Sequence, residues 1–361
     1  MDSSRSDLYY HDYLNLDALL GSQGLKSAEA GETVHDEMLF IVVHQAYELW
    51  FKQILWELSD VMSAFAGDHF DENDVARVTA RLRRITSIQR LLVTQIDVLE
   101  TMTPMDFLDF RDHLVPASGF QSVQFRLIEN RLGIRREDRL LFDGAPYTHR
   151  LEDGHRSVVE QSESEPNLHD AVDAWLARTP FLDDYRFWDA YRASVRSMLE
   201  GDREVVATNP NLGEDERAAQ LRTFEQTMGQ FEAAFDAERH DSLVADGTRR
   251  FSFRAFQAAL FISLYRDQPA LHQPFRLLEL LIDVDEGFTT WRYRHALMVQ
   301  RMIGAKVGTG GSAGAKYLLR LAERTRAFPD LLALPTFLVT RSARPDLPPE
   351  LTEQMRFRYQ P

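Results

Sequence analysis

The chain has 361 residues, of which 44% are hydrophobic, 11% aromatic and 27% charged, so it has the composition of a folded globular protein of one or two domains. Its 41 lysines and arginines against 56 aspartates and glutamates give a net charge of -15, which disfavours nucleic acid and anionic membrane surfaces as partners. No cysteine is present, which excludes disulfides and every thiolate-bound metal. No signal-peptide pattern or membrane-length apolar run is found, so we expect a cytoplasmic protein.

Two long helices are predicted in the first third of the chain. Between Glu37 and Phe65, apolar and aromatic residues recur every three or four positions, as on one face of a helix. The acidic residues from Asp71 to Asp74 suit the start of a second helix, which runs to Leu99. The first face consists of Phe40, His44, Tyr47, Phe51, Leu55 and Leu58.

Two shorter helices are predicted next. Thr103 followed by Pro104 has the residues of a helix start, so a short helix is expected there that ends near Pro116. Phe107 and Arg111 share its face because they are four residues apart. A capping-box pattern at Ser118 and Gln121 predicts the following helix, and Gly133 is expected to end it.

From about residue 135 to 247 the sequence becomes polar and acidic. Weak helices are predicted at 168–177 and 215–240, whereas 152–166 has the composition of a solvated loop. Because regular apolar periodicity resumes only at Phe251, this stretch is interpreted as an insertion that projects from a helical core.

The last third begins with two apolar helices, Phe251 to Arg266 and Pro274 to Ile303, separated around Pro269 and Pro274. The glycine-rich segment 308–314 then breaks the helical pattern. Six prolines between Pro329 and Pro361 predict an irregular tail. One stripe of the second helix carries Phe288, Trp291, His295, Met298 and Met302.

The predicted fold class is therefore all-α. We expect a helical core of residues 31–134 and 248–325, into which the acidic helical segment 135–247 is inserted. Residues 1–30 form an N-terminal segment, and residues 326–361 form a Pro-rich tail.

Two histidines, His44 and His295, lie in the apolar stripes of long helices. Hydrogen-bonded core histidines are the more common explanation, since histidine is intermediate in burial. Two such residues on separate helices also suit a haem pocket, with one imidazole as axial ligand and the other on the opposite side. Periodicity does not choose between these explanations.

Arg111 and the glycine-rich segment also have two explanations each. The Arg111 guanidinium is suited to binding a carboxylate with two hydrogen bonds, but it is equally suited to an ion pair with Asp109 or Asp112. The glycines are not followed by the Lys-Ser/Thr of a phosphate loop, so they predict a flexible loop or a lid in which Thr309 closes over a polar substrate.

Five motifs, in the same order along the chain, closely resemble those of the tryptophan 2,3-dioxygenase family. The acidic insertion resembles that of the longer, animal-type members of this family. The motifs are His35–Leu58, Phe107–Arg111, Pro116–Ser122, Trp291–His295 and Gly308–Ser312.

This resemblance implies the helical haem-binding fold of tryptophan and indoleamine 2,3-dioxygenases. It also implies haem b, ferrous in the active form, and a homotetramer. The implied activity is insertion of O2 across the indole C2–C3 bond of L-tryptophan to give N-formylkynurenine, the first step of the kynurenine pathway.

The resemblance also implies roles for individual residues. His295 matches the iron ligand, and His44 matches the catalytic histidine that orients the indole N–H through a hydrogen bond. Arg111 matches the clamp on the substrate carboxylate, and Thr309 the lid residue at the amino-acid end. Ser118 and Trp291 match residues beside the haem. Phe40 and Phe107 match aromatic walls of the indole pocket, and Phe40 also borders the haem. Tyr10, Tyr13 and Leu14 match a segment that is contributed to a neighbouring subunit.

Three residues depart from the family pattern. Ala313 replaces a serine, His11 replaces a glycine, and Ile96 replaces an aromatic residue near the haem. Two alternatives therefore stay open at this point. One is a related haem oxygenase that acts on a substituted indole, such as a 2-alkylindole, and inserts one oxygen atom. The other is a haem or indole sensor without turnover.

Overall fold

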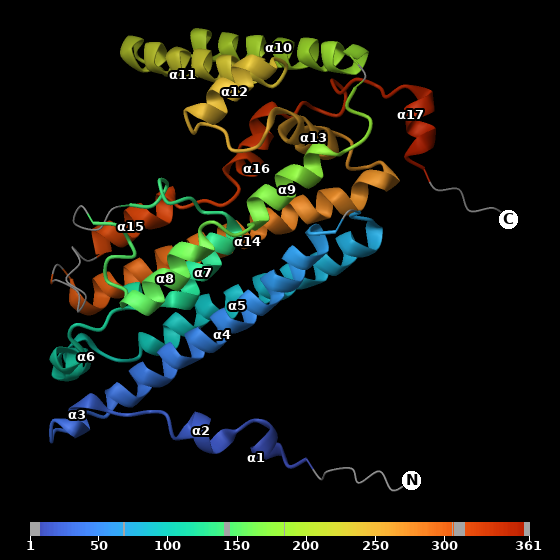
Figure 1. Cartoon of the computed structure of the whole chain (residues 1–361). Helices are drawn as coiled ribbons and strands as arrows, with labels where there is room; N and C mark the ends of the chain where they lie inside the picture. The colour runs from blue at the N-terminus through green and yellow to red at the C-terminus, as the bar shows by residue number, and fades with distance from the viewer. Residues whose placement is uncertain are drawn as a thin grey trace, which may run out of the picture.

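The computed structural model describes residues 8–67, 69–140, 145–183, 185–304, 306 and 315–356. Within these residues the chain is built of helices and contains no β-strand, which confirms the predicted all-α class (Figure 1). No helix in this part of the chain is both long and apolar enough to cross a membrane. The helices of ten or more residues are α4 (Asp36–Phe65), α5 (Glu72–Leu99), α7 (Val123–Leu132), α8 (Asp153–Ser162), α9 (Leu168–Ala177), α10 (Tyr185–Thr208), α11 (Glu214–Ala233), α13 (Phe253–Leu264), α14 (Pro269–Ile303) and α15 (Ala315–Arg324). The shorter ones are α1 (Tyr10–Tyr13), α2 (Leu16–Leu20), α3 (Lys26–Glu29), α6 (Pro104–Arg111), α12 (Ala237–Ala245), α16 (Pro329–Ala333) and α17 (Pro349–Gln354), with 3-10 turns η1 (Asp112–Leu114), η2 (Gly119–Gln121) and η3 (Leu334–Phe337).

The centre of the molecule is formed by three long helices, α4, α5 and α14 (Figure 1). Helix α5 packs against both α4 and α14 and begins at Asp71, whose side chain accepts hydrogen bonds from the backbone of Asn73 and Asp74. Gln89 of α5 donates a hydrogen bond to the Val284 carbonyl of α14 at 2.8 Å. A Cβ atom at Gly287 would lie 2.4 Å from Gln89 Oε1, so this glycine permits the two helices to approach closely.

The region between α5 and the end of α7 follows the prediction with one difference. Helix α6 begins at the predicted Thr103 cap, and Gly133, with φ +92°, ends α7. The Ser118 capping box, however, starts only the 3-10 turn η2. Ser122 has extended backbone and its side chain accepts from Phe125 N, so α7 begins afresh after it.

The prediction of a solvated loop at 152–166 is wrong, because α8 occupies most of it. Val159 and Ser162 of α8 are buried, and Asn130 of α7 donates hydrogen bonds to the Val159 carbonyl at 3.0 Å and to Ser162 Oγ at 2.6 Å. Helix α8 packs mainly on α7, so only the face that contacts α7 is buried and the other faces are polar. Local sequence therefore lacks the apolar stripe that would identify it.

The rest of the insertion is also more helical than predicted. Helix α9 has the predicted bounds, but α10 was not predicted, and the expected helix at 215–240 is divided into α11 and α12. The division falls at Asp236, whose side chain accepts a hydrogen bond from Arg239 N and caps α12. Helices α10 to α12 form a layer at one end of the molecule (Figure 1).

Two expectations about the last third need correction. Helix α14 begins at Pro269 rather than at Pro274, so the expected break between the two apolar helices is confined to residues 265–268. The tail is not irregular either: α16, η3 and α17 form there, each with proline near its start. Phe328, Phe337 and Met355 are buried, so the tail belongs to the hydrophobic core.

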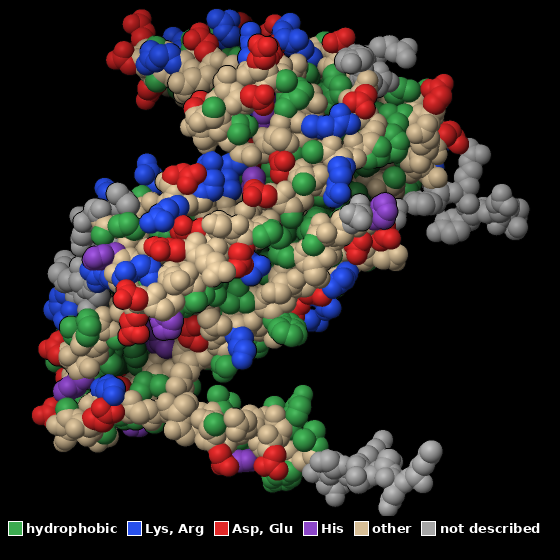
Figure 2. Space-filling view, in the orientation of Figure 1, with side chains coloured by type: hydrophobic (Ala, Val, Ile, Leu, Met, Phe, Trp, Pro, Cys, Tyr) green, Lys and Arg blue, Asp and Glu red, His purple; other side chains and the backbone are tan. Residues whose placement is uncertain are grey.

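The N-terminal segment projects from the body as an arm of α1 and α2 (Figures 1 and 2). Neither helix has a buried residue. The base of the arm, at α3, is anchored to α4, because the buried Glu37 carboxylate of α4 accepts hydrogen bonds from Lys26 N at 2.7 Å and Ser27 N at 2.9 Å. The arm therefore leaves the body from a defined anchor.

Candidate functional site

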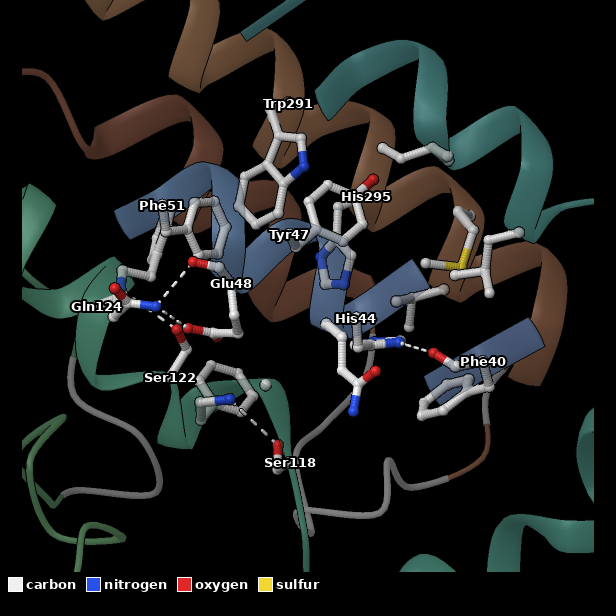
Figure 3. A pocket seen from close by; sticks show the side chains of 18 of the residues that line it. Phe40, His44, Tyr47, Glu48, Phe51, Ser118, Ser122, Gln124, Trp291 and His295 are labelled. Carbon is white, nitrogen blue, oxygen red and sulfur yellow. Dashed lines mark hydrogen bonds between the residues drawn. The ribbon is translucent and has the colours of Figure 1, made fainter. Parts of the chain in front are cut away.

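A cavity of about 650 Å³ lies between α4, α5, α6, α7 and α14 (Figure 3). Its volume is within the range of small-molecule and cofactor sites. His44 and Phe40 enter it from α4, and His295 and Trp291 enter it from α14. The two histidines that the sequence analysis singled out are thus brought to one cavity, although they lie in opposite thirds of the chain.

His295 faces the cavity without a hydrogen bond. Its ring is parallel to that of Trp291, one turn earlier on α14, with centroids 5.5 Å apart and an interplanar angle of 11°. Within the described residues, neither ring nitrogen has a hydrogen-bond partner. Burial, and secondarily His44, lowers the pKa of His295 to about 4. The imidazole is therefore neutral near pH 7 and presents a nitrogen lone pair.

His44 is held in one tautomer by its own helix. Its Nδ1 lies 2.7 Å from the Phe40 carbonyl oxygen, which only accepts, so Nδ1 carries the proton. Burial lowers the pKa of His44, against the opposing effect of this hydrogen bond and of Glu48. The ring is therefore neutral and Nε2 is an acceptor.

Aromatic rings form one wall of the cavity. The Phe40 centroid is 4.0 Å from that of His44 and 5.8 Å from that of Phe107. Arg111, one turn after Phe107 on α6, also lines the cavity. The alternative ion pair with Asp112 is present, but its Nη1–Oδ1 distance is 3.7 Å and the carboxylate is 89% exposed. Such an exposed pair is weak.

Polar side chains gather on the side of the cavity opposite the aromatic wall (Figure 3). Ser118 and Ser122 lie there, and Gln124 Nε2 donates to the Glu48 carbonyl at 2.8 Å and to Glu48 Oε2 at 2.9 Å. Sequence reasoning did not single out Glu48 or Gln124. Their pairing joins α4 to α7 across 76 residues, so no local pattern could have identified it.

A buried charge cluster adjoins this polar side and was also missed. Glu129 of α7 accepts from Arg126 Nη1 and from Arg292 Nη2 of α14, both at 2.9 Å. Burial alone raises the pKa of Glu129, but the guanidinium groups of Arg126, Arg139 and Arg292 outweigh it and hold this pKa at about 2. Arg126 and Arg292 line the cavity, which therefore has a cationic side.

The other residues that the sequence analysis named lie in different places. Thr309 and Ala313 are outside the described residues. Ile96 is buried and lines the cavity, so this departure from the family pattern affects the site directly. His11 is on the arm, 3.6 Å from Asp17. Three further residues of the arm are exposed and do not line the cavity of their own chain: Tyr10 at 70%, Tyr13 at 69% and Leu14 at 40%.

The fold and the site define a helical protein with an internal cavity of cofactor size and two neutral histidines in it. The family model for tryptophan 2,3-dioxygenase matches residues 1–338. The chain therefore belongs to the tryptophan 2,3-dioxygenase family, and it is an oxidoreductase of the dioxygenase type.

Relatives called tryptophan 2,3-dioxygenase match nearly the whole chain. The one from Bdellovibrio bacteriovorus is 49% identical over 98% of this chain and 99% of its own length. The one from Alteromonas mediterranea is 44% identical, with 98% of each chain covered. The one from Xenopus laevis is 45% identical over 97% of this chain and 86% of its own length. The two bacterial relatives thus match this chain over nearly their whole length, whereas the animal relative is longer.

Proposed function

We propose that this chain is a haem-dependent dioxygenase that inserts both atoms of O2 across the C2–C3 bond of L-tryptophan to give N-formylkynurenine, the first step of the kynurenine pathway. The observation that carries the proposal is the convergence of His44 and His295 on one cavity that Arg111 also lines. Similarity over nearly the full length to proteins called tryptophan 2,3-dioxygenase supports it.

The cavity residues fit haem b. The neutral His295 imidazole has no partner among the described residues, as an iron ligand requires before iron binds. Hydrocarbon side chains such as Leu99 and Val299 suit the porphyrin edge, and Ser118 and Arg126 suit its carboxylates. We therefore assign His295 as the iron ligand, with Trp291, Ser118 and Phe40 beside the macrocycle. When bound, ferrous haem supplies the binding and activation of O2.

The residues across the cavity from His295 bind and orient the indole. His44 Nε2, as an acceptor, receives the indole N–H, and the rings of Phe40 and Phe107 form aromatic walls of the indole pocket. The Arg111 guanidinium binds the substrate carboxylate. This contact is remote from the reacting C2 and C3 atoms, but its binding energy holds the indole so that these atoms are oriented for reaction. The apolar wall excludes water. Thr309, which lies outside the described residues, is assigned to the amino-acid end as part of a lid.

The exposed arm supports a homotetramer. Tyr10, Tyr13 and Leu14 expose apolar surface that their own chain does not cover. Such surface favours contact with another protein. In the proposed tetramer these residues reach the cavity of a neighbouring subunit.

The proposal is tested by mass spectrometry of the products made from 18O2 by the reduced, haem-loaded protein. L-Tryptophan is compared with indoles that lack the amino-acid group, including a 2-alkylindole. Two labelled atoms in N-formylkynurenine are expected. A single labelled atom, or turnover of the 2-alkylindole alone, would support the substituted-indole alternative. A Soret band without O2 consumption would support the sensor.

The iron ligand is tested separately. His295→Ala should remove the spectrum of histidine-ligated haem, and added imidazole should restore it. If the variant keeps that spectrum without imidazole, His295 is not the ligand. His272→Ala, on the same helix but outside the cavity, is the matched control.

A further inference from the structure

Three methionines line the cavity and are almost inaccessible to bulk solvent. Met102, in the connection between α5 and α6, is 4% exposed. Met298 and Met302, both on α14, are 8% and 6% exposed. These three side chains are called the methionine wall below.

The methionine wall lies at one end of the cavity. The C-terminal parts of α5 and α14 are side by side there, since Arg294 Nη2 is 2.7 Å from Asp97 Oδ1 and 3.4 Å from Glu100 Oε2. Met102 comes two residues after Glu100, and so it is brought next to the C-terminal part of α14. The cavity lining also includes the hydrocarbon side chains of Leu99, Val299 and Ile303, each within three residues of one of these methionines in the sequence.

The methionine wall is close to His295. Met298 and Met302 follow His295 by three and seven residues, which places all three on one face of α14. Their axial separations from His295 are about 4.5 Å and about 10.5 Å at the helical rise per residue. A planar group bound at His295 therefore extends toward these thioethers.

We propose that the methionine wall is a self-oxidation site, in which hydrogen peroxide formed inside the cavity converts the thioethers to sulfoxides. The inference rests on the proposed function, because haem at His295 is where O2 would receive electrons. Without tryptophan, O2 takes two electrons from an external reductant such as ascorbate, together with two protons, and becomes hydrogen peroxide. A sulfur electron pair then bonds to one peroxide oxygen, the O–O bond breaks, and the second oxygen leaves as water.

The consequence is a loss of cofactor affinity. A sulfoxide is polar, whereas the side chains of Leu99, Val299 and Ile303, which line the cavity with these methionines, offer its oxygen no hydrogen-bond donor. Burial of an unsatisfied polar group is unfavourable, and so is its contact with an apolar porphyrin edge. Tryptophan protects the protein in this scheme because it consumes the bound O2.

Two exposed methionines provide an internal control. Met38 on α4 is 40% exposed and Met105 on α6 is 68% exposed. Peroxide that arrives from solution oxidises these first, because oxidation follows access to the sulfur. Peroxide formed inside the cavity reverses the order. The pattern of sulfoxides therefore reports where the oxidant is formed.

The experiment incubates the full-length, haem-loaded protein with O2 and ascorbate, without tryptophan and with catalase in solution. Sulfoxide at each methionine is measured by peptide mass spectrometry. We expect the methionine wall to be oxidised several-fold faster than Met38 and Met105. Oxidation in the order of solvent exposure, or complete protection by catalase, would overturn the inference. Protein loaded with redox-inert zinc protoporphyrin and kept in the dark should show no oxidation of the wall.

Variants give a second measurement. In the triple variant M102L/M298L/M302L, the Soret band should decay several-fold more slowly under the same conditions, because leucine has similar volume and no oxidisable sulfur. The matched control M38L/M105L should decay like the wild type. Decay of the triple variant at the wild-type rate contradicts the inference, and if that variant does not bind haem, the sulfoxide map of the unmodified chain decides.

The same preparation separates the two proposals. Absence of the Soret band or of N-formylkynurenine formation shows that the proposed function is wrong, and the inference falls with it. Normal haem binding and turnover with an unoxidised methionine wall overturns the inference alone.

Discussion

Trp291 lies parallel to His295 on one face of α14, with ring centroids 5.5 Å apart and planes 11° apart. Tyr47 of α4 contacts the Trp291 ring edge-to-face, with centroids 5.9 Å apart and planes 64° apart, so the Trp291 side chain packs against α4. The stacked indole limits rotation of the His295 ring. It therefore prepares the imidazole for one orientation toward a bound metal.

Removal of this stacking should weaken haem binding. In Trp291→Leu we expect the free energy of haem binding to weaken by about 0.5–1.5 kcal/mol, which corresponds to a roughly twofold to tenfold increase in the haem Kd. Trp291→Phe keeps an aromatic ring and should stay near the wild-type value. Haem titration of the apoprotein measures both. Equal affinity of the leucine variant and the wild type would show that the stacking has no role in haem binding.

Arg111 is expected to act on substrates that carry a carboxylate. In Arg111→Ala, the loss of charge-assisted hydrogen bonds should reduce kcat/KM for L-tryptophan by roughly tenfold to a hundredfold, or about 1.5–3 kcal/mol. Oxidation of 3-methylindole, which has no carboxylate, should change little. Arg83→Ala, at an exposed position on α5, is the control. An equal effect on both substrates would exclude a carboxylate clamp.

The buried cluster around Glu129 should be important for stability. Glu129→Gln leaves the guanidinium groups of Arg126 and Arg292 without their carboxylate, so we expect a decrease of about 3–5 kcal/mol in the free energy of unfolding. Urea denaturation provides the measurement. The exposed Lys26–Glu29 ion pair gives the control, since Glu29→Gln should cost less than about 1 kcal/mol.

The same carboxylate should contribute to acid unfolding. Its pKa is about 2 in the folded protein and near 4.5 when it is unfolded. A lowered carboxyl pKa means that the unfolded chain binds the proton more readily, so the contribution is complete above pH 4.5 and is lost as the pH falls toward 2. The pH dependence of unfolding between these values should be shallower in Glu129→Gln. An unchanged slope would mean that Glu129 is not charged in the folded protein.

Gly287 should tolerate no side chain. In Gly287→Ala the new Cβ meets the Gln89 amide, at 2.4 Å from Oε1, and we expect a destabilisation of about 1–3 kcal/mol. Gly229→Ala, on the exposed side of α11 with no atom near its Cβ, should instead be stabilising by about 0.5–1 kcal/mol. Thermal unfolding distinguishes them. The double variant Gln89→Ala/Gly287→Ala should recover part of the loss, and no recovery would mean that the steric contact is not the cause.

Local sequence was sufficient for α4, α5 and α9, but not for α10, which is also long. The spacing of Phe40, His44 and Tyr47 predicts α4, and Asp71 and Gly133 mark helix termini that the structure confirms. It was insufficient for α8 and for the tail. Helix α8 depends on its contacts with α7, and the short helices of the tail form where its buried residues pack into the core.

Helical periodicity, capping residues and motifs are properties of neighbouring residues, and they were enough to predict the all-α class, the family and the two histidines of the site. The structure was needed to show that His44 and His295 share a cavity, that Glu129 pairs with Arg292 across 163 residues, and that three methionines line this cavity. The physical reason is that burial, pKa and ion pairing depend on which helices pack together. That packing is set by the sum of many weak contacts, and no single segment encodes it.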